Sequence, residues 1–207
     1  MARRIRNVLL LAVTLCCISL PLQVSAEEST VTLAIPYPVT HLEHLALDEP
    51  IQRIIFENIG IGLTKATLGN GAELHGAAGM QILEGGRTWE FTLPENLAFP
   101  SGQSLEADEV AQSFSYYQSQ ISKTSAPKTF ASIANSLSNI DSVKGDSGSR
   151  LVRIHLRKAD LGFSRGAATL PIINSTIRKA FGSGYGYGTQ VSVLGSYQII
   201  KNDEEYG

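Results

Sequence analysis

The stretch GGRTWEFTLPENLAFPSGQSLEADEVAQSF, residues 85–114, decides the fold that this sequence predicts. It opens on a β-branched and aromatic run in which Trp89, Phe91 and Leu93 alternate with polar neighbours. Because successive side chains of a strand point to opposite faces, this alternation predicts a strand with one buried face. Proline, asparagine, serine and glycine at 94–102 favour turns, which end the strand.

A helix with an acidic first turn is predicted to follow the turns. Ser104 is a good N-cap, because its hydroxyl can accept a hydrogen bond from a free N–H of the first turn. Acidic residues at 106–109 fall where the helix dipole favours negative charge. Val110 and Phe114 then recur at helical spacing. Strand, turns and helix therefore form one unit.

This unit resembles the signature of the bacterial extracellular solute-binding proteins of the oligopeptide, dipeptide and nickel type, which serve ABC importers. The signature consists of an aromatic strand, a turn glycine and an Ala-Asp-Asp/Glu-Val helix start ending in Ser-Phe or Ser-Leu. The matching residues are Trp89, Phe91, Leu93, Phe99, Gly102, Ala107, Asp108, Val110, Ser113 and Phe114. The resemblance implies an α/β fold: the first lobe of a bilobed type II periplasmic-binding-protein fold, with a mixed sheet and a satellite subdomain. The second lobe is expected to be absent, so that 27–207 is a truncated N-terminal lobe.

Residues 1–26 have the pattern of a secretory signal peptide. Three arginines precede an apolar run that is too short to span a membrane comfortably, and Val24, Ser25 and Ala26 form a small-residue cleavage site. Both cysteines lie within this segment, so the cleaved chain can form neither a disulfide nor a thiolate site. The sequence therefore predicts a periplasmic product released by signal cleavage.

The cleaved chain is long enough for one domain and is acidic. A chain of this length buries about 70% of the surface that it exposes when unfolded. It would carry 14 basic and 19 acidic residues, a formal charge of −5. Because it also lacks a cluster of basic residues interleaved with aromatic ones, nucleic acid is excluded as a partner.

Periodicity predicts further elements on both sides of the central unit. They are a strand at 30–35, a helix at 50–62, an extended piece at 63–72 closed by Asn70-Gly71, a helix at 130–140, a turn at 144–149 and a strand at 150–156. Residues 193–200 resemble a weakened Gly-Thr-Gly-Pro-Tyr strand of the same family.

Two motifs suggest chemistry that their context does not support. Residues 162–166 match the nucleophile elbow G-x-S-x-G, but no histidine follows His155, so we reject catalysis. His41 and His44 could bind Zn²⁺ or Ni²⁺ if their segment were helical; a solvated loop is the preferred interpretation, and we expect neither metal nor cofactor. We therefore expect that the protein is not an enzyme.

Two other motifs are given structural interpretations. The glycine-rich run 182–188 is interpreted as a flexible linker, with tyrosines that could stack on a ligand or cover a neighbouring surface. The sequon at Asn174 has meaning only in a eukaryotic secretory route, whereas the resemblance is to bacterial proteins.

The resemblance implies binding and delivery without chemistry. The expected function is that of a periplasmic solute-binding component of an ABC importer, present as an N-terminal portion, with a peptide or other small polar solute as ligand and the inner-membrane permease as partner. Tyr37 and His41, after the first strand, and Phe130, at the start of a later helix, are the expected ligand-binding residues. The alternative is a secreted stand-alone interaction or adapter domain derived from such a lobe.

Overall fold

The computed structural model describes residues 30–32, 42, 50–69, 71–121 and 131–200. The chain divides into two compact units, Met1–Ala34 and Ile35–Gly207, and every helix and strand below belongs to the second. The first unit contributes only residues 30–32, which form no strand, so the strand expected at 30–35 is absent from its described half. The signal peptide expected at 1–26 lies outside the described residues.

A four-stranded sheet is built from two hairpins. Its strands are β3 (Gly79–Leu83), β4 (Thr88–Thr92), β5 (Ile140–Asp146) and β6 (Leu151–Leu156), in the order β3-β4-β6-β5. Each of these pairings is antiparallel, with Trp89 opposite Ile154 and Phe91 opposite Val152. The strands expected around Trp89 and at 150–156 are confirmed. The α/β class is confirmed too, and the described sheets are antiparallel throughout.

Strand β5 corrects the turn that the sequence predicted at 144–149. The strand continues to Asp146, and the turn occupies 147–150. Its residues IDSVKGD show no apolar alternation, and six of the seven residues are only half-buried or exposed. Pairing with β6, and not an intrinsic pattern, therefore holds β5 in the sheet.

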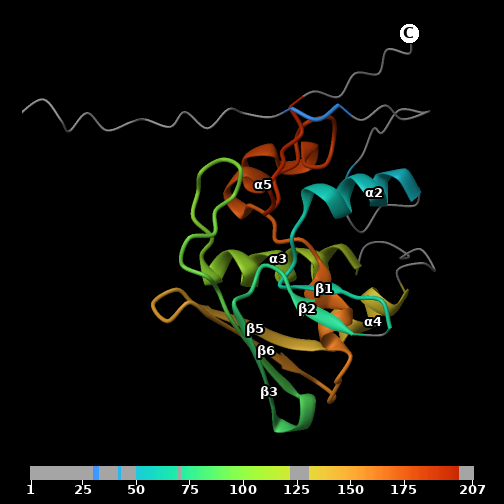
Figure 1. Cartoon of the computed structure of the whole chain (residues 1–207), viewed down its shortest axis with the longest axis vertical. Helices are drawn as coiled ribbons and strands as arrows, with labels where there is room; N and C mark the ends of the chain where they lie inside the picture. The colour runs from blue at the N-terminus through green and yellow to red at the C-terminus, as the bar shows by residue number, and fades with distance from the viewer. Residues whose placement is uncertain (1–29, 33–41, 43–49, 70, 122–130, 201–207) are drawn as a thin grey trace, which may run out of the picture. The chain divides into compact units, whose positions relative to one another are not determined.

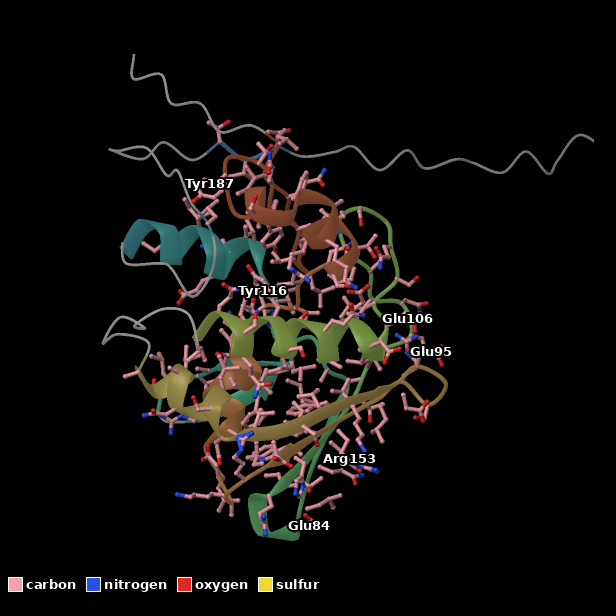
Figure 2. The ribbon with its side chains drawn as sticks, turned by 180° about the vertical axis from the view of Figure 1, so that it is seen from behind. Glu84, Glu95, Glu106, Tyr116, Arg153 and Tyr187 are labelled. Atoms are coloured by element: carbon pink, nitrogen blue, oxygen red, sulfur yellow. The ribbon has the colours of Figure 1, made fainter. Side chains whose placement is uncertain are left out.

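The two faces of the sheet have opposite chemistry. Trp89, Phe91 and Ile154 are buried on the face covered by helix α3 (Ala107–Ile121). On the other face Arg153 and Glu90 form an ion pair at 2.5 Å, and in Figure 2 Arg153 lies on the side of the strands turned away from Tyr116 of α3. The alternation predicted for this strand thus separates core from solvent.

Helix α3 begins three residues later than its expected cap. Ser104 pairs with Ala98 in an isolated bridge, so it does not cap the helix, and the first turn is closed by a hydrogen bond from Glu109 N to Glu106 O at 3.0 Å. The cause is local: the chain must first return across the 98–104 turn before it can enter the helix. The predicted helical periodicity is confirmed, since Val110, Phe114 and Tyr117 are buried.

Two smaller elements pack beside α3 and the sheet. Helix α4 (Ala131–Ser138) confirms most of the helix expected at 130–140 and buries Leu137. Strands β1 (Thr64–Ala66) and β2 (Ala72–Leu74) form a hairpin. Two 3₁₀ turns, η4 (Phe163–Arg165) and η5 (Ala167–Thr169), pack against β1. A third, η2 (Glu84–Gly86), closes the β3–β4 hairpin.

Helices α2 (Pro50–Ile59) and α5 (Ser175–Phe181) lie on the side of α3 opposite the sheet (Figure 1). The chain after α2 is tied to two distant segments, because Ile61 N donates to Leu194 O (2.6 Å) and Ile172 N donates to Ile61 O (3.0 Å). The 193–200 segment forms a single bridge, Val193 with Ile173, in place of the strand suggested by the resemblance. No helix in the described ranges is long and apolar enough to cross a membrane.

Candidate functional site

A buried carboxylate joins the start of α3 to the start of α5. Glu109 is only 7% exposed, and one of its oxygens, Oε1, accepts from Gln103 Nε2 at 3.0 Å. The other oxygen, Oε2, accepts from Ser175 N at 2.9 Å. Ser113, one turn further along α3, accepts from Ile173 N at 2.9 Å. These hydrogen bonds hold the 173–175 segment against α3, and α5 begins within this segment, at Ser175.

Asn174 connects the same network to the turn before α3. Its Oδ1 accepts from Ile177 N at 3.0 Å, which makes it the N-cap of α5. Its Nδ2 donates to Gln103 Oε1 at 3.0 Å and approaches Ser101 Oγ at 3.4 Å. Asn174 is fully buried, so its amide is unsuited to accept a glycan and serves as a structural group. Asn before Ser-Thr is also the pattern of a helix N-cap, which the sequon interpretation did not include.

A groove lies directly beside this network, between α5, the end of α2 and the 189–199 segment. Ser101 belongs to both the groove and the network. Ile177 and Phe181 of α5 supply apolar surface, whereas Tyr197 and Gln198 supply polar groups from the opposite wall. Phe181 and Tyr197 are partly exposed. Apolar walls with a few polar groups suit the binding of a small molecule or peptide side chain.

An aromatic cluster joins α3 to α5 and to the 182–188 segment. Tyr116 of α3 meets Tyr185 edge-on, with ring centroids 6.2 Å apart, and Figure 2 shows Tyr116 between α3 and α5. The Arg178 guanidinium of α5 lies 4.5 Å from the centre of the Tyr116 ring, a cation–π contact. Tyr185 is buried, and its hydroxyl donates to Ser192 O at 3.2 Å. The linker expected at 182–188 is therefore wrong at Tyr185, which packs as a core residue.

The residues expected to bind ligand are not tested by this geometry. Tyr37, His41 and Phe130 all lie outside the described residues, as does His44 of the possible metal pair. Among the described residues no group of three or more His, Cys, Asp or Glu side chains is arranged to hold a metal ion.

Ser164 of the rejected elbow motif lies in the 3₁₀ turn η4. It is buried, and its carbonyl oxygen accepts from Thr64 Oγ1 at 2.6 Å. No strand leads directly into this turn, because β6 ends at Leu156. The strand-turn-helix context of a nucleophile elbow is therefore missing at this serine.

Sequence comparison alone finds no relative of this chain: no family model matches it, and no curated protein is significantly similar. Solved structures do match. The substrate-binding domain of an oligopeptide ABC transporter from Bacillus anthracis superposes with a TM-score of 0.63 at 17% identity, over 82% of this chain and 36% of that one. The oligopeptide-binding protein AppA of Bacillus subtilis, in complex with a nonapeptide, gives 0.58 at 19% identity, over 72% and 28%.

A nickel-binding protein has the same likeness. NikZ of Campylobacter jejuni, in complex with Ni(L-His), gives a TM-score of 0.57 at 18% identity, over 72% of this chain and 29% of that one. These matches confirm the expected fold: the chain is built like part of a substrate-binding protein of the oligopeptide and nickel type. It spans only 28% to 36% of the length of these three proteins.

Proposed function

We propose that this chain is part of the solute-binding component of an ABC importer, with a peptide or similar polar solute as its ligand. The observation that carries the proposal is the shared fold, because the matching structures include an oligopeptide transporter domain and a protein holding a nonapeptide. The groove beside α5 supports it by offering apolar walls and a few polar groups next to the hydrogen-bonded network of Asn174. The chain would bind and deliver its ligand without chemistry.

The proposal includes the organisation expected from the sequence. Residues 1–26 would direct export and be removed, and 27–207 would form the N-terminal lobe of a periplasmic protein that docks on a permease in the inner membrane. Tyr37, His41 and Phe130 would contribute to the ligand site. A second lobe would close on the same ligand, so the groove described above would be one wall of the complete site.

The test begins with the native protein recovered from the cell envelope. Its intact mass is compared with the mass of residues 27–207, and its melting temperature is then recorded with mixed tri- to pentapeptides and with free amino acids as a control. We expect a species of more than twice that mass, stabilised by the peptides. A ligand at a hundredfold excess over its Kd stabilises a protein by about 2.7 kcal/mol.

Matched variants locate the binding site. Tyr197→Ala and Tyr37→Ala should weaken the peptide-dependent shift, whereas Leu68→Ala, at a fully exposed position in the β1–β2 connection, should leave it unchanged. A native mass equal to that of residues 27–207, together with a melting temperature that ignores peptides, would contradict the proposal. That result would favour the alternative, a stand-alone interaction domain.

A further inference from the structure

A second groove lies at a different place from the one beside α5. It runs between α4 and the 157–166 segment that follows β6, and we call it the α4 groove. Its two walls are joined by hydrogen bonds: Asn139 Nδ2 donates to Lys158 O (2.9 Å), and Lys158 N donates to Asn139 Oδ1 (3.0 Å). Ala167 N, at the groove's end, donates to Ser136 Oγ at 3.1 Å. These hydrogen bonds fix the two walls relative to each other.

The charges of the α4 groove are opposite in sign to those of the chain as a whole. The chain has a formal charge of −2, yet the groove is lined by Arg157, Lys158 and Arg165 and by a single carboxylate, Asp160. That carboxylate already accepts a hydrogen bond from Gly162 N at 2.8 Å. Arg87 adds a further guanidinium nearby, since its Nη2 donates to Arg157 O at 3.3 Å.

The cations are presented on a fixed backbone. Arg157 N donates to Asn139 O (2.8 Å), and its Nη1 donates to Ser138 O at the end of α4 (3.1 Å). Its guanidinium remains half-exposed, 3.8 Å from Asp141. Lys158 contacts Asn139 through its backbone, which leaves its ammonium exposed. Positive groups fixed in a hollow focus their field on an anionic partner.

The remaining lining favours a peptide as the occupant. Ser132, Asn135 and Ser138 place hydroxyl and amide groups along the α4 wall, where they can pair with a main chain. A lipid surface is broad and would approach a protruding face, whereas these cations line a concave one. We propose that the α4 groove is a docking surface for an acidic, extended segment of a protein partner.

The test uses the full chain and a fluorescein-labelled 12-residue peptide of alternating Asp, Glu and Gly, with a Lys-Gly peptide as the opposite-charge control. Fluorescence anisotropy measures Kd at low and at physiological salt. We expect the acidic peptide alone to bind, and to bind more weakly as salt screens the charges. Lys158→Glu should weaken binding by about tenfold, because it replaces an attraction with a repulsion inside the groove.

Lys144→Glu is the matched control, because Lys144 is exposed on β5 and does not line the groove. It makes the same charge change and should alter Kd by less than about twofold. Equal weakening by both variants, or no binding of the acidic peptide, would overturn the proposal. Binding of the chain to phosphatidylglycerol vesicles but not to the acidic peptide would also overturn it. If Lys158→Glu then abolished the vesicle binding, the groove would be assigned to a membrane surface.

Discussion

The buried side chain of Glu109 connects two elements of the fold. Its two oxygens accept from Gln103 Nε2 and from Ser175 N, so it links the turn before α3 to the start of α5. Both hydrogen-bond donors are neutral groups, and both of these hydrogen bonds need the Glu109 carboxylate as the acceptor. Any change that shortens the side chain leaves these two donors without this acceptor, and the Ser175 N–H is buried.

We expect Glu109→Ala to lower the free energy of unfolding by about 2–3 kcal/mol, because it leaves those two donors unsatisfied. Urea denaturation followed by circular dichroism measures the loss. Asp108→Ala is the control: Asp108 is exposed in the same first turn, so only its favourable interaction with the helix dipole disappears, about 0.5 kcal/mol. Similar losses in the two variants would show that Glu109 does not hold the two elements together.

His75 gives the protein a pH-dependent contribution of known sign. Its pKa is lowered, first by the partial burial of the ring and then by the nearby Lys65 ammonium, against a smaller opposing effect of Glu73. The unfolded state therefore binds the proton more readily than the folded state. The stability that neutral His75 supplies is present above pH 6.5, its ordinary pKa, and is lost as the pH falls below it.

We therefore expect the wild type to lose more stability than His75→Gln when the pH is lowered from 8 to 5. Gln carries no charge at either pH, so the difference between the two proteins isolates this histidine. Urea midpoints measured across the range provide the check. Parallel pH profiles for the two proteins would mean that His75 has the same pKa in the folded and unfolded chains.

At the scale of elements, the packing of α3 on β5 depends on one glycine. A Cβ placed on Gly145 would lie 2.4 Å from the Ala107 carbonyl carbon and 2.6 Å from Asp108 N, at the start of α3. These are backbone atoms, so neither can move aside without shifting the helix. The absence of a side chain is what lets the helix lie this close to the strand.

Gly145→Ala should cost about 1–3 kcal/mol of unfolding free energy, because it overpacks this contact. Gly148→Ala, in the turn that follows β5, is the control: its added Cβ would meet only Asp146 Oδ1, at an ordinary 3.4 Å. Urea denaturation of both variants makes the comparison. If Gly145→Ala is as stable as Gly148→Ala, the close approach of α3 does not restrict residue 145.

The elements with strong apolar periodicity were the ones that the sequence predicted correctly. Trp89 and Phe91 in β4, and Val110 and Phe114 in α3, bury the face that their spacing indicated. The full length of strand β5 was not predicted, because its pairing with β6 sets its conformation and its own sequence has no hydrophobic alternation that would indicate a strand.

The candidate site was harder to predict than the fold. Its network joins Asn174 to Gln103 and Ser175 to Glu109, pairs that are 71 and 66 positions apart, through hydrogen bonds that form only in the tertiary fold. Asn174 could have been identified as a helix cap from its local sequence. The Gln103 and Ser175 contacts of Glu109 could not, because nothing in the residue types marks one carboxylate of an acidic first turn as the buried one.

At the scale of the whole molecule, α3 connects the sheet to the α2 and α5 side. Tyr117 Oη donates to Pro171 O at 2.8 Å, and Ser113 contacts Ile173, so the helix that covers the sheet also holds the chain leading to α5. Trp89, the chain's one tryptophan, lies in the sheet core and is 1% exposed. It reports on the sheet, whereas far-ultraviolet circular dichroism also reports on the helices.

We expect tryptophan fluorescence and circular dichroism to give the same urea midpoint, because the shared helix makes the two sides unfold together. Equilibrium titrations of one sample by both methods provide the measurement. A lower midpoint by circular dichroism would contradict this expectation, since it would show that α2 and α5 unfold while the sheet around Trp89 remains intact.

The hydrogen bond between Ile61 and Leu194 has a consequence for how the chain is made. The two residues are about 130 positions apart, so at roughly 5–20 residues per second the ribosome adds Leu194 roughly 7–26 s after Ile61. All four strands of the main sheet are synthesised within that interval. The nascent chain can therefore complete its sheet before Leu194, the acceptor of the Ile61 N–H, has been synthesised.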